Sequence, residues 1–209
     1  MGRNEGMNVQ LPFTQTKGME SSVLVSLNTT HVSLPKMKIK EIDLSPLRNC
    51  RNLQRLDLYN NMISFLDLSP LENMEHFQVL YLWGNPLQTI DLSVLKTLPS
   101  LKEIGLSASQ LEILDLSPLQ GSTSFWKIGF WKNKIRSLDL RPLSACTSLS
   151  GMWFTDNPID TLDISPLISC FNLSTLKAPY QTQKTTIFRK EFTNLMGSKV
   201  VSGARVFDK

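Results

Sequence analysis

Residues that build catalytic or metal centres are scarce in this chain of 209 residues. It has three cysteines and two histidines, and the histidines, His31 and His76, stand far apart in the sequence. A zinc site needs several Cys or His ligands at short spacing, and nucleophilic catalysis needs a base beside the nucleophile. The sequence has neither arrangement, and it has no glycine-rich loop for a phosphate. We therefore expect a protein that is not an enzyme and that uses no metal and no cofactor.

Long apolar runs are also missing. No stretch approaches the roughly 18 to 20 apolar residues of a membrane span, and residues 1 to 15 have neither a basic run nor an apolar signal core. These absences predict a cytoplasmic protein that does not enter a membrane. The net charge of +4 resides in residues 184 to 209, which hold six basic and two acidic residues. The rest of the chain is balanced, so we expect no nucleic-acid partner.

A repeat of 24 residues is the strongest feature of the sequence. The motif Asp-Leu-Ser-Pro-Leu, with small changes in three copies, begins at Asp43, Asp67, Asp91, Asp115, Asp139 and Asp163. Within each unit apolar and polar residues alternate, as in Leu56-Asp57-Leu58, which is the pattern of a half-buried strand. The pair Ser69-Pro70 predicts the N-cap and first residue of a short helical or 3-10 segment. No unit can bury its leucines alone, so neighbouring units have to stack.

The spacing of these apolar residues resembles that of the leucine-rich-repeat family. The family's LxxLxLxxNxI core recurs over about residues 32 to 181 and is matched in one unit by Leu53, Leu56, Leu58, Asn61 and Ile63. The Asp-Leu-Ser-Pro-Leu form is similar to repeats of uncharacterised prokaryotic members. The resemblance implies an α/β solenoid, with a curved parallel β-sheet on the concave side and short helices or 3-10 turns on the convex side. It also implies protein recognition on the concave face.

The two ends of the chain depart from the repeat. We expect an N-terminal cap over residues 1–31, in which Val23 to Leu27 pairs as a strand. About six or seven repeat units follow over residues 32–181, and a C-terminal cap occupies residues 182–209. In that cap, Glu191 to Met196 is predicted as a short helix and Val200 to Phe207 as a strand. Such caps shield the exposed ends of a solenoid core.

Three further sets of residues recur in register. Side-chain amides at one position are predicted to bond backbone groups inside the turn, from Asn61, Asn85, Asn133 and Asn157. Ser109 takes this position in the central unit and predicts an altered turn there. The motif aspartates are expected to be solvated or to accept backbone N–H bonds, since one carboxylate per unit supplies too few ligands for a cation site. Cys50, Cys146 and Cys170 share one apolar position and are expected to be buried thiols, although the last two stand within reach of a disulfide.

The residues between the strand leucines form the candidate binding surface, because the core does not need them. Large aromatic residues occupy several of these positions, and Gly105 and Gly129 leave a gap among them, so that the set describes a trough. Rigid aromatic side chains around a recess are typical of interface hot spots. Glu103 and Lys127 flank the trough and could select the charge of a partner. The predicted binding residues are Tyr59, Tyr81, Trp83, Glu103, Lys127, Trp131 and Trp153.

These patterns favour a protein or peptide partner, bound by a monomer. Three other interpretations stay open on the sequence alone. The aromatic rings could only stack on one another across the strands. The trough could be a receptor for a small ligand or carbohydrate, or the chain could be a structural scaffold domain of a larger assembly.

Overall fold

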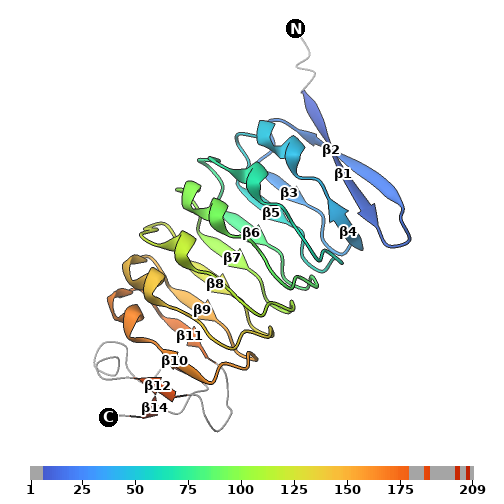
Figure 1. Cartoon of the computed structure of the whole chain (residues 1–209). Helices are drawn as coiled ribbons and strands as arrows, with labels where there is room; N and C mark the ends of the chain where they lie inside the picture. Colours follow the sequence, from blue (N-terminus) through green and yellow to red (C-terminus); the bar gives the residue numbers. More distant parts are fainter. Residues whose placement is uncertain (1–6, 179–185, 189–200, 203–205, 208–209) are drawn as a thin grey trace.

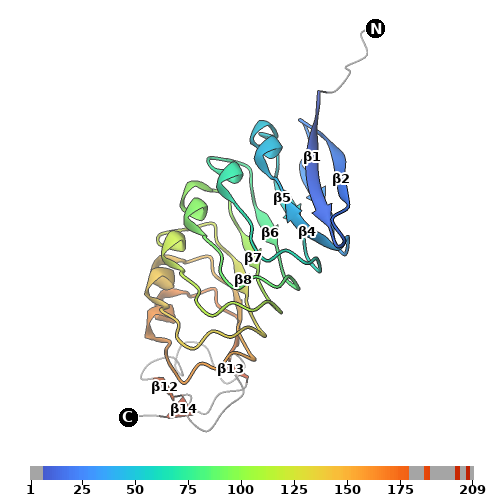
Figure 2. The same cartoon turned by 45° about the vertical axis from the view of Figure 1, so that its right-hand side comes forward.

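Seven parallel strands at intervals of 24 residues build one sheet of a curved solenoid (Figures 1 and 2). The computed structural model describes residues 7–178, 186–188, 201–202 and 206–207. The seven strands are β3 (His31–Ser33), β5 (Arg55–Asp57), β6 (Val79–Tyr81), β7 (Glu103–Gly105), β8 (Lys127–Gly129), β9 (Gly151–Trp153) and β11 (Thr175–Lys177). At the C-terminal edge of the sheet, β13 (Val201–Ser202) pairs with β11.

The register of this sheet places equivalent repeat positions side by side. Leu56 pairs with Leu80, and Leu80 pairs with Ile104. Each of these middle residues is buried, and the core between the sheet and the convex side consists of stacked leucine, isoleucine and phenylalanine side chains. The predicted leucine-rich-repeat solenoid with an α/β layout is therefore confirmed.

On the side opposite the sheet, each coil of the repeat carries one 3-10 segment. These are η1 (Ser45–Asn49), η2 (Ser69–Leu71), η3 (Ser93–Thr97), η4 (Ser117–Leu119), η5 (Arg141–Ala145) and η6 (Ser165–Ser169). The residues before each 3-10 segment form a strand only in β4 (Ile39–Ile42) and β10 (Thr161–Asp163), among the described coils. The reason is local, since only these two have a neighbouring strand that pairs with them, β1 or β12.

The N-terminus of each 3-10 segment is held by the motif aspartate and not by the serine. The serine was expected to cap, and this was wrong, because the residue at the cap position is Leu68 in η2 and its equivalents elsewhere, without a side-chain cap bond. Instead, Oδ1 of the aspartate accepts the backbone N–H two residues later, at 2.8–2.9 Å, in all six coils. The expectation that these carboxylates accept backbone bonds is confirmed.

The buried asparagines tie each coil to the one before it. Asn85 Nδ2 donates to the carbonyl oxygens of Leu82, in its own coil, and Leu58, in the preceding coil, at 2.8 and 2.9 Å. Asn85 Oδ1 accepts the Ile63 N–H at 3.1 Å. Asn61, Asn133 and Asn157 repeat the arrangement.

The altered turn expected at Ser109 is also present. No amide oxygen reaches the Leu87 N–H from position 109. This N–H donates to the carbonyl oxygen of Asn85 at 2.8 Å instead.

Additional strands cover both ends of the coils. At the N-terminal end, β1 (Asn8–Gln15) and β2 (Glu20–Ser26) form an antiparallel hairpin, which holds most of the predicted strand, and its side chains Leu11, Phe13 and Val25 are buried. At the other end, β12 (Thr186–Phe188) pairs with β10 and β14 (Val206–Phe207) pairs with β12. The strand predicted over 200–207 is wrong as one element, because β13 and β14 belong to different sheets. The helix predicted over 191–196 lies outside the described residues.

The asparagine bonds predict a large loss of stability on truncation. In Asn133→Ala, two backbone carbonyl oxygens and the Leu111 N–H lose a partner inside the core. We expect the free energy of unfolding to fall by about 2–4 kcal/mol, measured by urea denaturation. Asn52→Ala, at an exposed position, is the control and is expected to stay within about 0.5 kcal/mol of the wild type. Equal losses in both variants would contradict this role.

The aspartate bonds predict a pH dependence of stability. Bonds to the Ser93 backbone and side chain lower the pKa of Asp91 below its ordinary 3.8. A lowered folded-state pKa means that the stabilisation is present above the unfolded pKa and is lost as the pH falls through the folded pKa. Asp91→Ala should therefore lower the melting temperature at pH 6, and the difference from the wild type should disappear toward pH 2. A difference in melting temperature that persists at low pH would contradict this role of the carboxylate. Asp160→Ala, outside the motif, is the control.

Candidate functional site: the aromatic concave face

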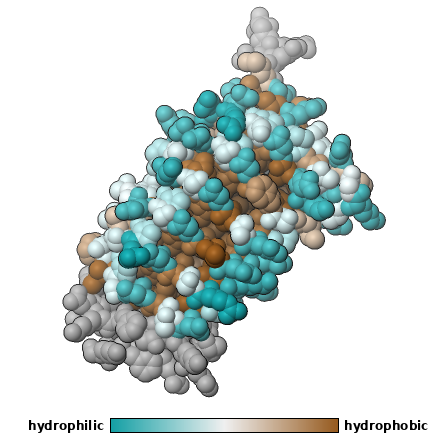
Figure 3. Space-filling model, in the orientation of Figure 1, coloured by the Kyte–Doolittle hydropathy of each residue, from teal (hydrophilic) through white to brown (hydrophobic). Residues whose placement is uncertain are grey.

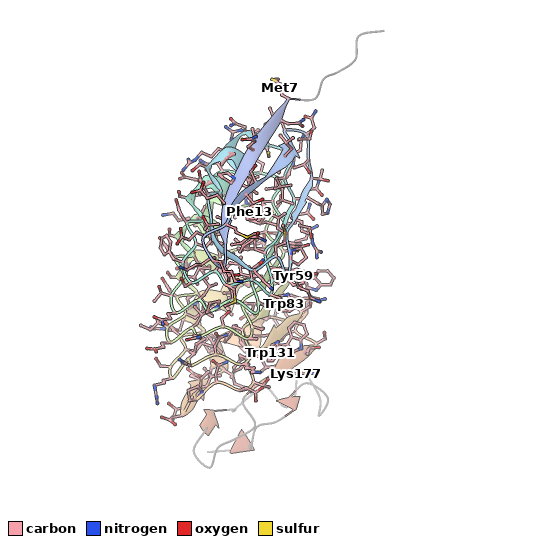
Figure 4. The ribbon with its side chains drawn as sticks, turned by 90° about the vertical axis from the view of Figure 1, so that its right-hand side faces the viewer. Met7, Phe13, Tyr59, Trp83, Trp131 and Lys177 are labelled. Atoms are coloured by element: carbon pink, nitrogen blue, oxygen red, sulfur yellow. The ribbon has the colours of Figure 1, made fainter. Side chains whose placement is uncertain are left out.

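The sheet displays three columns of side chains that point away from the core. Two columns come from the first and last residue of each strand, and the third comes from the second residue after the strand. Tyr59, Trp83 and Trp131 share the third column, and Figure 4 shows them with Lys177 along one side of the solenoid. The rings of Tyr59 and Trp83 stack, with centroids 4.3 Å apart and planes at 9°. For this pair, stacking across the strands is therefore realised, and the stack covers the N-terminal part of the sheet.

Beside this stack, charged side chains on the N-terminal half of the face contact one another and the Tyr81 ring. Asp57 is 6% exposed and accepts the Arg55 Nε–H with both carboxylate oxygens, at 3.0 and 2.9 Å. The Arg55 guanidinium lies 4.7 Å from the centre of the Tyr81 ring. Burial, followed by the interaction with the nearby Glu103 carboxylate, raises the pKa of Tyr81 to about 12. Arg55 thus links Asp57 to the Tyr81 ring on this half of the face.

The C-terminal half of the face is more open. Trp131 is 40% exposed and Trp126, at the margin of the sheet, is 47% exposed. Lys127 Nζ lies 4.4 Å from the centre of the Trp126 ring, a cation–π contact. Gly129 forms the floor between these rims, and a Cβ placed there would meet only Ser107 Oγ within 4 Å, at 3.2 Å. We call Trp126, Lys127, Gly129, Trp131 and Trp153 the open half of the face.

The two glycines of the predicted trough differ in what lies above them. A Cβ on Gly105 would come within 3.0 Å of the Tyr81 ring and 3.2 Å of the Trp83 ring, so these side chains lean over the glycine. Gly105 is buried, whereas Gly129 is half-buried. The trough is therefore filled at Gly105, toward its N-terminal end, and open above Gly129, toward its C-terminal end.

Glu103 and Lys127, the predicted charged pair, pair in register on β7 and β8. Their side chains nevertheless form no ion pair with each other, and the Lys127 ammonium lies over the Trp126 ring. The ion pairs of the described residues are Arg55–Asp57 and Arg141–Asp139. The Lys127 ammonium is therefore free of a carboxylate partner in this part of the chain.

A recess beside Trp126 escaped the sequence analysis. It has a volume of about 420 Å³ and is lined by Lys102, Ser124, Trp126, Ser148, Ser150 and Asn172. These residues occupy two repeat positions just before the strands, so the same 24-residue alignment that found the three columns could have found this polar margin.

A second surface with exposed apolar side chains lies on the convex side. Phe65 and Ile113 are each 75% exposed and share one repeat position. A pocket of about 560 Å³ lies next to Phe65, with Leu66, Ile90 and Val94 in its lining. Figure 3, in the view of Figure 1, shows apolar side chains in a band along the middle of this face, with hydrophilic ones on both sides.

The reactive residues outside the face are buried or dispersed. All three cysteines are free and buried, which confirms the expected thiols. Burial raises the pKa of Cys146 and Cys170 to about 11. Within the described ranges, no group of three or more His, Cys, Asp or Glu side chains could hold a metal ion. The same residues include no helix with the length and hydropathy of a membrane span.

Two solved structures with a similar fold are internalins from Listeria monocytogenes. The internalin inlF is 24% identical, with a TM-score of 0.60, and the match covers 80% of this chain and 46% of the internalin. Internalin C2 is 26% identical, with a TM-score of 0.55, and the match covers 88% of this chain and 85% of that one. This chain thus spans about half the length of the first. No protein-family model and no curated protein matches the sequence.

The repeat, the parallel sheet and these likenesses define the fold of the protein, which is a leucine-rich-repeat solenoid. More particularly, the fold is similar to that of the two internalins, and the convex side of the described coils carries 3-10 segments. The resemblance drawn from the repeat is confirmed.

Packing within β9 predicts how Trp153 is positioned. A Cβ on Gly151 would overlap the six-membered ring of the Trp153 indole, which lies against this glycine. Gly151→Ala should therefore displace the ring and change the near-ultraviolet circular dichroism, while the far-ultraviolet spectrum stays the same. Gly129→Ala is the matched control, because its nearest neighbour is a serine hydroxyl. An unchanged near-ultraviolet spectrum in Gly151→Ala would show that the ring does not lie there.

Proposed function

We propose that this chain is a non-enzymatic recognition module that binds another protein through its concave face. The observation that carries the proposal is the open half of the face, where Trp131 and Trp153 stand beside a glycine floor at positions that the repeat does not require to be apolar. Leaving large aromatic rings partly in water costs free energy that a partner's apolar side chains recover on binding. Leucine-rich-repeat folds commonly present such a sheet to a partner, which supports the proposal.

The residues of the face have different roles in this proposal. Trp131 and Trp126 contact the partner, since their rings are exposed. Trp153 contacts it as well, because this residue lies next to Gly129 in the sheet. Tyr59 and Trp83, stacked on each other, provide a rigid flat surface next to it. Tyr81 lies over Gly105, with Glu103 near it, and fixes the shape of the filled end.

Affinity capture from the extract of the source cells, read by mass spectrometry, tests the proposal. The baits are the wild-type chain and a Trp131→Ala, Trp153→Ala variant that retains its far-ultraviolet circular dichroism. We expect a partner to bind the wild type and the variant to bind it about 30-fold more weakly or worse, because central aromatic residues each contribute about 1–2 kcal/mol or more to interfaces.

Phe65→Ala is the matched control, because it removes an exposed aromatic ring from the convex side. It should capture the same partner as the wild type. If the tryptophan variant keeps its partner while Phe65→Ala loses it, the binding surface is convex and the proposal is wrong. Tryptophan fluorescence quenched by simple sugars, with no protein captured, would favour a small-ligand receptor instead.

A further inference from the structure

The charged side chains of the concave face are unevenly satisfied. On the N-terminal half, Asp57 is paired with Arg55, and the Glu103 carboxylate lies near the Tyr81 side chain. On the C-terminal half, Lys127 lies against the Trp126 ring and Lys177 is exposed, and neither is in an ion pair of the described residues. The open half of the face therefore carries two ammonium groups without an ion-pair partner, against the single carboxylate of Glu103 in register with Lys127.

The recess beside Trp126 extends this positive region. Lys102 lines it together with three serines and Asn172, and no acidic residue contributes to its lining. The Lys102 ammonium is bonded to a neutral group, Gln78 Oε1, at 3.0 Å. Ammonium and hydroxyl groups without a nearby carboxylate are suited to an anionic group from outside.

The opposite margin of the face does not cancel this charge. Lys132 and Asp156 occupy the same repeat position in neighbouring coils and are both exposed, so their charges offset each other. The positive side of the trough is thus the side of Lys102, Trp126 and Lys127. The glycine floor and the Trp131 ring, on the other side, suit an apolar side chain.

We propose that the partner presents an acidic segment to the open half of the concave face, with carboxylates placed at Lys102, Lys127 and Lys177 and an apolar side chain over Gly129. This inference rests on the proposed function and adds the chemistry of the partner. Charge complementarity of this kind selects partners and speeds association. A nucleic acid fits less well, because Arg55 is occupied by Asp57 and Glu103 interrupts a continuous row of cations for phosphates.

Random copolymers are the probes for this inference. A glutamate–tyrosine copolymer and a lysine–tyrosine copolymer carry the same aromatic residue with opposite charges. Binding is read from tryptophan fluorescence, because Trp83, Trp126, Trp131 and Trp153 all lie on or beside the face. We expect the acidic copolymer to change the fluorescence in a saturable manner, more weakly at higher salt, and the basic copolymer to have no effect. Equal binding of both copolymers, or binding of neither, would overturn the inference.

Charge reversal locates the site. In the double variant Lys102→Glu, Lys127→Glu, the affinity for the acidic copolymer should fall by on the order of tenfold or more. The control is Lys40→Glu, Lys96→Glu, with the same change of charge at exposed positions outside the face, and it should bind almost as the wild type does. A similar loss in both variants would show that only the net charge matters and would overturn the inference. If oligothymidylate binds more tightly than the acidic copolymer, the partner is a nucleic acid and the inference of an acidic protein segment is wrong.

The failure of this inference can be told from the failure of the proposed function. The lysine variant and the Trp131→Ala, Trp153→Ala variant are compared as baits for the captured partner. If the tryptophan variant loses the partner and the lysine variant keeps it, the concave face binds a protein whose segment is not acidic. If neither variant loses the partner, both proposals are wrong.

Discussion

Stacking of one coil on the next is the constraint on which this structure depends. A single coil has a three-residue strand and one 3-10 turn, which cannot enclose a core, so every leucine column is buried only by its neighbours. The asparagine amides make this stacking specific. Each Nδ2 group bonds a carbonyl of its own coil and one of the preceding coil, so a change in repeat length would leave buried polar groups without partners.

The same stacking explains why the concave face can vary. Strands about 4.8 Å apart hold the outward residues in straight columns whatever their identity. Tyr59, Trp83, Ser107 and Trp131 can therefore follow one another in a column without changing the fold. The glycines have a further effect. At Gly105 the neighbouring rings fill the space that a side chain would take, whereas at Gly129 the space stays open, so two identical residues on adjacent strands give different surfaces.

Charge on the face follows from local pairing more than from composition. The chain outside residues 184 to 209 is balanced in charge, yet on the concave face Asp57 is paired with Arg55, whereas Lys127 and Lys177 are in no ion pair of the described residues. Arg55 reaches Asp57 on its own strand because both point to the same side, two residues apart. Lys127 instead turns to the Trp126 ring. A balanced composition thus coexists with a positive, aromatic half-face, which is the basis for expecting an acidic segment on the partner.

The sequence alone determined the solenoid, the 24-residue register of its strands, the asparagine bonds and the altered turn at Ser109, because each depends on the repeat period and on contacts between equivalent positions. It also determined that the aromatic residues point out of the core. Only the tertiary structure decided that Tyr59 and Trp83 stack, that Arg55 lies over the Tyr81 ring and that Gly105 is covered while Gly129 is open. The same holds for the aspartate that caps in place of the serine, and for the recess at Trp126. These outcomes depend on side-chain rotamers and on distances between neighbouring coils, which a repeat pattern does not contain.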